Sequence, residues 1–140
     1  RQIPIAFDPA SFHLIQGYGP FRLMEEVGKV DFLLLNENEA QTLLPGKSPC
    51  ELLRWANVVI LKRGGEGATV FGLEKEISAP GVPTHVLDTT GAGDAFDACF
   101  LVNYLHGESA QNSLERANAL GAYVVARLGA QPDWEQTTFS

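Results

Sequence analysis

Two carboxylates enclose a run of small residues at positions 88–94, which reads Asp-Thr-Thr-Gly-Ala-Gly-Asp. Gly91, Ala92 and Gly93 have little or no side chain, so a charged ligand can reach their backbone N–H groups. A helix predicted to begin there adds the positive end of its dipole, which favours a phosphate or oxyanion site. Asp94 would repel phosphate, but it is suited to take the proton of a hydroxyl group that attacks phosphate. The segment therefore indicates phosphoryl transfer.

A structural interpretation competes with the catalytic one at these positions. Carboxylates are common in the first turn of a helix, so an isolated aspartate here would more often favour a helix start than catalyse. Glycines are also expected wherever a tight turn precedes a helix. Here the aspartate ends a Gly-Ala-Gly-Asp segment that follows Asp-Thr-Thr, and this combination favours catalysis by Asp94. Asp97, one turn further along, is the rival carboxylate and is expected to face solvent, away from the anion-binding turn.

Alternating strands and helices are expected to position this segment. Apolar runs predict buried strands at 3–7, 32–35 and 58–62. Helical spacing and capping residues predict helices at 20–27, 36–44 and 48–56. Asn36 with Glu39, and Ser48 with Glu51, have the spacing of capping boxes. This order predicts an α/β fold, a three-layer sandwich with a mostly parallel sheet and helices on both faces.

A glycine-rich hairpin and two longer helices follow in the sequence. Residues 63–67 predict a turn between the strand at 58–62 and a returning strand at 68–71. Further predicted elements are short strands at 76–78 and 84–87, a helix at 93–105 anchored by Phe96, Phe100, Val102 and Leu105, and a helix from a cap at Ser109 to about residue 128, stopped by Gly129. Sites in parallel sheets lie beyond the carboxyl ends of the strands. We therefore expect Asn36, the turn at 64–67 and the loop at 91–94 to share one crevice.

Composition excludes several function classes. The chain has 140 residues, enough for one domain, and a net charge of −7 without a basic stripe, so nucleic acid is not an expected partner. Cys50 and Cys99 match no zinc or redox spacing. No long apolar run predicts a membrane span and no signal peptide is visible, so a cytoplasmic location is expected. The chain opens directly on a predicted strand, which we interpret as a start in the middle of a fold.

Several segments together resemble the ribokinase-like (PfkB) sugar kinases. Residues 88–94 resemble the signature loop of that family, and residues 35–40 contain its Asn-x-x-Glu motif. The segments 3–9, 59–68 and 117–130 resemble its Asp-Pro strand end, its nucleotide-side strand and turn, and its last helix. One departure is Cys99, where the family usually has glycine, which we interpret as a packing detail. The resemblance implies that residues 1–140 form the C-terminal nucleotide-binding and catalytic half of such a kinase, without the N-terminal half that holds most sugar contacts.

The resemblance also implies roles for residues on the nucleotide side. It implies ATP with Mg²⁺, with Asn36 and Glu39 organising magnesium and phosphate through water, although a plain helix cap is the other interpretation. Gly64 and Gly67 are expected along the ATP, and Lys62 either pairs with phosphate or is simply solvated.

Two further positions carry a role on the same basis. Asp88 is a candidate ligand for K⁺ beside the anion-binding loop or a turn cap, and neither is favoured. Asn118 falls where adenine contacts are implied, but a polar residue on a helix is more often only exposed.

The leading hypothesis is an ATP-dependent kinase that phosphorylates a hydroxyl group of a sugar or sugar-like molecule. Asp94 is the base and the amides of Gly91–Gly93 hold the phosphate. A nucleoside kinase of the adenosine type shares these motifs and stays open. Two other hypotheses are a non-catalytic nucleotide-binding fragment that lacks an acceptor site, and a domain whose exposed sheet edge pairs with a second copy to give a homodimer.

Overall fold

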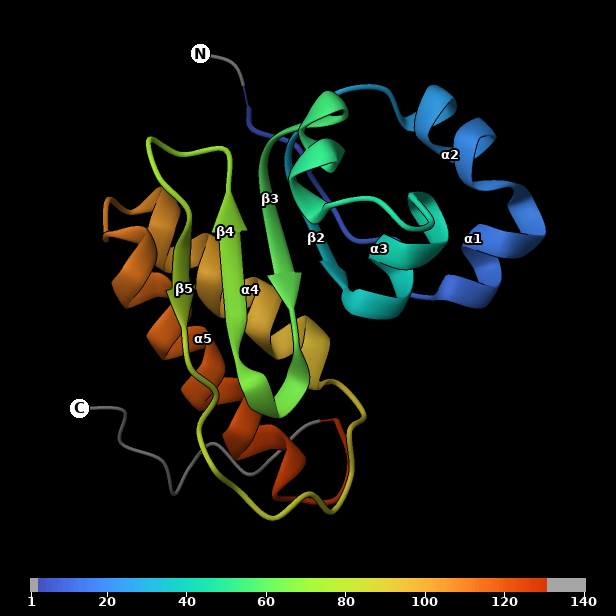
Figure 1. Cartoon of the computed structure of the whole chain (residues 1–140). Coiled ribbons are helices and arrows are strands. Elements are labelled where there is room, and N and C mark those ends of the chain that lie inside the picture. The colour runs from blue at the N-terminus through green and yellow to red at the C-terminus, as the bar shows by residue number, and fades with distance from the viewer. Residues whose placement is uncertain (1–2, 131–140) are drawn as a thin grey trace. The chain divides into compact units, whose positions relative to one another are not determined.

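The computed structural model describes residues 3–130, and the chain divides into two compact units at residues 78 and 79 (Figure 1). The first unit holds most of the sheet, and the second holds the two longest helices. Within residues 3–130, no helix is long and apolar enough to cross a membrane.

The first unit is a sheet with helices packed on it. Its elements are β1 (Ala6–Phe7), α1 (Phe12–Tyr18), α2 (Pro20–Val27), β2 (Val30–Asn36), α3 (Glu37–Leu43), the 3₁₀ helix η1 (Pro49–Arg54), β3 (Ala56–Lys62), the 3₁₀ helix η2 (Gly64–Glu66), β4 (Ala68–Phe71) and β5 (Ile77–Ala79), which crosses the boundary. The strand order is β1-β2-β3-β4-β5, with β1, β2 and β3 parallel and β4 antiparallel to β3. The predicted α/β class with a mostly parallel sheet is confirmed.

Alternate residues of β2 and β3 build the core of the first unit. Leu33 and Leu35 of β2 share a face with Val59 and Leu61 of β3, because side chains alternate across a strand. That face packs against α1, α2, α3 and η1, through Ile15, Met24, Leu43 and Leu52. All eight side chains are buried, so the helices fix the strands whose carboxyl ends carry polar residues. The predicted strands at 32–35 and 58–62 and helix at 20–27 are confirmed.

The hairpin from β3 to β4 is also confirmed. Gly72, directly after β4, has a φ of +94°, and an added Cβ would lie 2.2 Å from the carbonyl oxygen of Asn57. Only glycine fits there, because the backbone of the neighbouring strand comes too close for any side chain.

Two predictions for the first unit are wrong, and one helix was missed. The segment 3–7 is not a buried strand: only Ala6 and Phe7 pair, and Ile3 and Ile5 are 83% and 57% exposed, because this strand is the edge of the sheet. The segment 48–56 is a 3₁₀ helix that ends at Arg54, and the Ser48 side chain makes no cap hydrogen bond. The helix α1 was not predicted, since its short sequence lacks a clear polar face.

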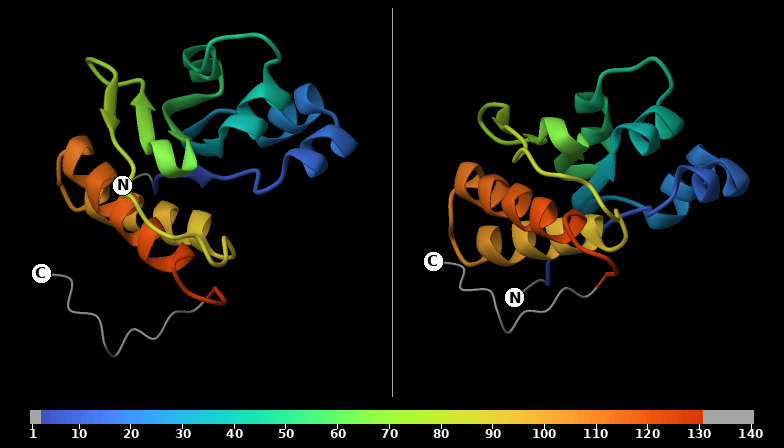
Figure 2. Two further views of the ribbon diagram at one scale, coloured as in Figure 1. Left: turned by 60° about the horizontal axis from the view of Figure 1, so that its bottom comes forward. Right: turned by 90° about the horizontal axis from the view of Figure 1, so that it is seen from below.

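The second unit pairs α4 (Ala92–Leu105) with α5 (Ala110–Val125), which lie side by side in both views of Figure 2. The predicted cap at Ser109 is confirmed, because its Oγ accepts a hydrogen bond from the Asn112 N–H. Phe100 is fully buried and stacks on Tyr104 at 5.6 Å between ring centroids. Because α4 packs against α5, the loop that leads into α4 at Gly91 has a fixed end point in this unit.

Other predictions for the second unit need correction. Residues 84–87 form no strand, and Val86 and Leu87 are exposed. Val102 and Leu105 are 55% and 53% exposed, so Phe96 and Phe100 alone of the four expected anchors are buried. The last helix ends at Val125 instead of residue 128, and the following turn reaches Gly129 with a φ of +85°.

Candidate functional site

The carboxyl ends of three parallel strands carry polar residues that interact. Asp8 follows β1, Asn36 ends β2 and Lys62 ends β3, and Asn36 is the register partner of Lys62. Lys62 Nζ lies 2.6 Å from Asp8 Oδ2, and these side chains are only 14% and 26% exposed. Asp8, Asn36, Glu39 and Lys62 are called the strand-end cluster below. Asp8 was not among the predicted site residues, although the Asp-Pro step after a strand was a signal for it.

Glu39 and Asn36 form the predicted capping box at the start of α3. Glu39 Oε2 accepts from the Asn36 N–H at 2.8 Å, and Asn36 Oδ1 accepts from the Glu39 N–H at 3.0 Å. Glu39 is almost fully buried, and this burial raises its pKa. The hydrogen bond from Asn36 opposes that rise, the Asp8 carboxylate adds to it, and the Lys62 ammonium opposes it. The cap is confirmed, and the role of both residues toward magnesium and phosphate stays a prediction.

The glycine turn after β3 is a single 3₁₀ turn. The Gly67 N–H donates to the Gly64 carbonyl oxygen at 3.1 Å, and the Arg63 N–H donates to the Gly67 carbonyl oxygen at 2.8 Å. Gly64 is exposed. Arg63 donates from one terminal nitrogen to Thr69 Oγ1 at 2.6 Å, while its buried Nε has no partner within residues 3–130. The turn leaves the backbone open at Gly64 but buries Gly67, and the contact of either residue with ATP stays a prediction.

The loop at residues 88–94, called the anion-binding loop for the role that the sequence predicts, depends on a glycine in the left-handed region. Gly91 has a φ of +76°, and an added Cβ would lie 2.8 Å from the Ala130 Cβ and 3.0 Å from its Cα. The Ala92 N–H donates to the Thr89 carbonyl oxygen at 3.2 Å, so it is already engaged. Gly93 lies in the first turn of α4, where N–H groups have no acceptor within the helix. Of the three expected donors, Gly93 is therefore open and Ala92 is not.

Asp94 lies in the first turn of α4 and is exposed. Its carboxylate makes no hydrogen bond or ion pair in the part of the chain that the structure describes. Such a group is accessible to a substrate hydroxyl, as a general base must be. Asp97 is half-buried and has an interaction of its own, which corrects the expectation that it simply faces solvent.

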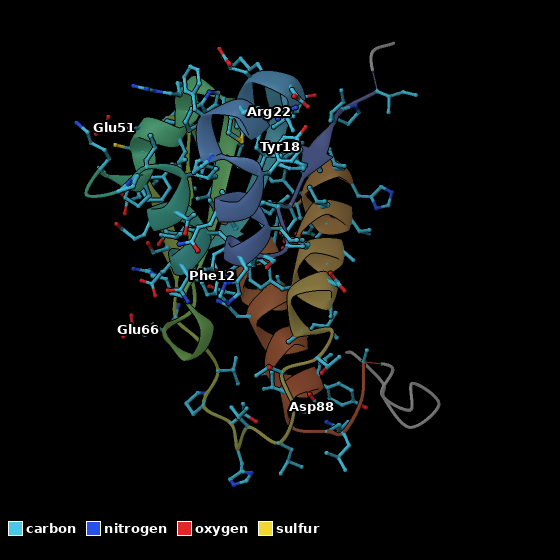
Figure 3. The ribbon with its side chains drawn as sticks, turned by 90° about the vertical axis from the view of Figure 1, so that its right-hand side faces the viewer. Phe12, Tyr18, Arg22, Glu51, Glu66 and Asp88 are labelled. Atoms are coloured by element: carbon cyan, nitrogen blue, oxygen red, sulfur yellow. The ribbon has the colours of Figure 1, made fainter. Side chains whose placement is uncertain are left out.

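Asp88 ties the anion-binding loop to the turn after α5. Its Oδ1 accepts from the N–H and the hydroxyl of Thr90, at 2.9 and 2.6 Å, and its Oδ2 accepts from the Gly129 N–H at 2.9 Å. These hydrogen bonds, those from Thr90 first, lower the pKa of Asp88 to about 2. Figure 3 labels Asp88 in the loop that leads into α4. The turn-cap interpretation is confirmed, and a role toward K⁺ stays a prediction.

Asn118 is buried in α5. Its Nδ2 donates to the carbonyl oxygens of Ala79 and Pro80, at 3.2 and 3.0 Å, and so holds the segment that follows β5. The expectation of a merely exposed helix residue is wrong, and its contact with adenine stays a prediction. Asn36 and Asp94 belong to different units, so their common crevice also stays a prediction. In residues 3–130, no group of three His, Cys, Asp or Glu side chains could hold a metal.

Known proteins resemble most of the chain. The sequence model of the pfkB family carbohydrate kinases matches residues 19–137. The ribokinase of Bacillus subtilis (strain 168) is 31% identical over 132 residues, which is 94% of this chain and 43% of that protein. The chain thus spans less than half of the length of this relative.

Solved structures give the same result for the fold. The adenosine kinase of Sinorhizobium meliloti matches with a TM-score of 0.81 and 27% identity, over 91% of this chain and 41% of that chain. An Escherichia coli protein described as a ribokinase II, solved with ATP and Mg²⁺, matches with a TM-score of 0.79 and 28% identity, over 91% of this chain and 44% of that chain. The coverage fits a partial ribokinase-like domain.

Proposed function

This chain belongs to the pfkB family of carbohydrate kinases, and on that premise we propose that it is the nucleotide-binding and catalytic part of an ATP-dependent kinase that phosphorylates a sugar or sugar-like alcohol. The observation that carries the proposal is the exposed Asp94 in the first turn of α4, directly after the left-handed Gly91. A free carboxylate next to open backbone donors meets the needs of alcohol phosphorylation, which are a base and a positive cradle for phosphate.

The proposed reaction is a transfer of the γ-phosphoryl group. The Asp94 carboxylate takes the proton of the acceptor hydroxyl while that oxygen forms a bond to the γ-phosphorus and the bond from this phosphorus to the β-phosphate oxygen breaks. ADP leaves with the electron pair of the broken bond. The Gly93 N–H and the amino end of α4 stabilise the charge that develops on the phosphoryl oxygens. Gly91 and Ala92 are proposed donors as well, and the Ala92 N–H must leave the Thr89 carbonyl oxygen to act.

Asn36, Glu39, Gly64, Gly67 and Asn118 are proposed to serve the nucleotide and its magnesium. Mg²⁺ prefers water and phosphate oxygens with few protein ligands. One buried carboxylate beside an amide fits an indirect hold on this ion, since both side chains already bond within the capping box. When bound, Mg²⁺ would neutralise charge on the phosphates.

A potassium ion at Asp88 is a separate proposal. It is tested by exchanging K⁺ for tetramethylammonium in the assay: a fall in turnover supports it, and an unchanged rate rejects it.

The acceptor is proposed to be a sugar, with a nucleoside as the second candidate. A ribokinase and an adenosine kinase both match more than nine-tenths of this chain. Ribose and adenosine share a ribosyl group, so the match favours acceptors of this shape without separating the two. We also propose that the chain works with the remaining part of the fold that these relatives have, and that its location is cytoplasmic. A homodimer is a further proposal, and a mass measurement in solution distinguishes monomer from dimer.

The proposal is tested by coupling ADP formation to an assay with ribose, fructose and adenosine as acceptors. We expect acceptor-dependent turnover, and we expect Asp94→Asn to lower it about 10²- to 10⁴-fold with ATP affinity nearly unchanged. Asp97→Asn is the matched control, since it removes the neighbouring carboxylate of α4. Near-normal turnover in Asp94→Asn would remove Asp94 from its role. Nucleotide binding without turnover on any acceptor would favour the non-catalytic fragment.

A further inference from the structure

The strand-end cluster holds more charge than a helix cap requires. Two carboxylates, Asp8 and Glu39, and one ammonium, Lys62, gather at the carboxyl ends of β1, β2 and β3. The ion pair of Lys62 with Asp8 joins the first and third of these strands across the second. We propose that Asp8 and Lys62 form a positioning pair that holds the Glu39 carboxylate against Asn36 at the start of α3, so that Lys62 is an internal counter-ion and not a phosphate ligand.

The geometry of Asp8 supports a fixed pair. Its Oδ1 accepts from the Ala10 N–H at 2.6 Å, and its Oδ2 accepts from Lys62 Nζ. Ala10 has a φ of +60°, so the backbone after β1 turns sharply to make this contact. Both oxygens of Asp8 are thus engaged, and the two hydrogen bonds together fix the orientation of its carboxylate.

Burial separates this ion pair from an ordinary surface pair. The side chains of Arg22 and Glu26 form an ion pair on α2 with 68% and 54% exposure, whereas Lys62 and Asp8 are 14% and 26% exposed. Shielded charges interact more strongly than solvated ones, and removing one partner leaves the other poorly compensated. Lys62 is therefore costly to detach from Asp8.

The register links the pair to Glu39. Lys62 is the register partner of Asn36, and the N–H of Asn36 is the group that Glu39 accepts from. Glu39 responds to both members of the pair, because Asp8 raises its pKa and Lys62 lowers it. Without Lys62, the charge of Asp8 would act on the Glu39 carboxylate uncompensated, which would weaken the hold of Glu39 on the Asn36 N–H.

A phosphate ligand and a counter-ion predict different outcomes for the same substitution. If Lys62 bound phosphate in place of Asp8, the Asp8 carboxylate would lie uncompensated beside a polyanion. If Lys62 is a counter-ion, the effect of Lys62→Met is reversed when Asp8→Asn removes the opposing charge. If Lys62 binds phosphate, the second substitution restores nothing.

The test is amide hydrogen exchange of the full chain, measured by nuclear magnetic resonance without nucleotide. We expect Lys62→Met to accelerate exchange of the Asn36 N–H about tenfold relative to the Leu34 N–H, which lies in the same strand, and Lys62→Met with Asp8→Asn to return it to within about threefold of the original chain. Lys62→Arg keeps the charge and should keep the protection. Lys47→Met removes an exposed lysine and should change neither amide. Unchanged exchange in Lys62→Met, or a double variant no better protected, overturns the proposal.

A second measurement tests the effect of the pair on nucleotide binding. This effect rests on the proposed function, whereas the hydrogen-exchange result does not. Calorimetry with a non-hydrolysable ATP analogue and Mg²⁺ should show weaker binding in Lys62→Met and recovery in the double variant. Equal weakening in both variants would make Lys62 a phosphate ligand and overturn the inference. If the original chain binds no nucleotide, the proposed function fails while the exchange experiment still decides the pair. Should Lys62→Met not fold, folding of the double variant with a protected Asn36 N–H supports the pair, and its failure to fold overturns it.

Discussion

The strand-end cluster and the anion-binding loop, residues 88–94, differ in the chemical groups that they contain. The cluster consists of three charged side chains and one amide, which are largely shielded and engaged with one another. The loop offers backbone N–H groups and one exposed carboxylate without a partner in residues 3–130. Backbone donors carry no net charge, so they can stand open to solvent at little cost, whereas buried charges require counter-ions. This difference supports the proposals that the loop binds a ligand and that Lys62 serves as an internal counter-ion.

The largest expected effect comes from filling the space at Gly91. Gly91→Ala places a side chain at a positive φ and against Ala130, which costs about 1–3 kcal/mol in strain and distorts the open donors of the loop. We expect phosphoryl transfer per folded molecule to fall at least about tenfold, since misplacing donors by a fraction of an ångström is costly in catalysis. Turnover and urea unfolding of the same preparation measure the two effects.

Gly72→Ala is the matched control for this prediction. Its Cβ would also meet backbone at positive φ, against the Asn57 carbonyl oxygen, but far in sequence from any proposed catalytic residue. It should lower stability without lowering turnover per folded molecule. Equal losses of turnover in both variants would show that Gly91 acts only through folding. The open donors of the loop would then have no special role in catalysis.

Removing charge from the cluster is expected to have a smaller effect. Glu39→Gln keeps an oxygen that can accept from the Asn36 N–H, so the free energy of unfolding should change by less than about 1 kcal/mol. The loss of a buried carboxylate should still weaken nucleotide binding in the presence of Mg²⁺ but not in its absence. Calorimetry with and without the metal measures this, and Glu37→Gln, an exposed residue of the same helix, is the control. If binding is unchanged in both media, Glu39 is a helix cap and nothing more.

The sequence predicted the parts of the molecule that depend on local patterns. Apolar runs placed β2 and β3, and the spacing of Asn36 and Glu39 predicted a capping box that both hydrogen bonds confirm. Edge position is not a local property, so the run at 3–7 was mistaken for a buried strand. The Asp8 and Lys62 pair was not predictable either, because its partners are 54 residues apart and meet only through strand order.

The same limit applied in the second unit. For Asn118 the sequence left open an adenine contact and a merely exposed position, because a helix pattern does not show what a buried amide will bind. Its partners, Ala79 and Pro80, are 39 and 38 residues away. Val102 and Leu105 have apolar side chains at helical spacing, but the last turns of α4 are left uncovered in the structure. Burial depends on which segments meet, and spacing along the chain carries little of that information.

The smallest expected effect lies in the acid range and concerns Asp88. The folded pKa of this carboxyl is about 2, below its ordinary value of 3.8, so the ionised form stabilises the folded state. That contribution is fully present above about pH 4 and is lost as the pH falls toward 2. Asp88→Asn should therefore show a smaller loss of stability between pH 4 and pH 2 than the original chain does. At neutral pH, Asp88→Asn should destabilise the chain less than Gly91→Ala does. Thermal unfolding across this range measures it, with the exposed Asp94→Asn as the control, because the Asp94 carboxylate accepts no hydrogen bond in residues 3–130. An identical acid response in Asp88→Asn and the original chain would show that the hydrogen bonds from Thr90 and Gly129 do not hold the loop, and that its shape depends on Gly91 alone.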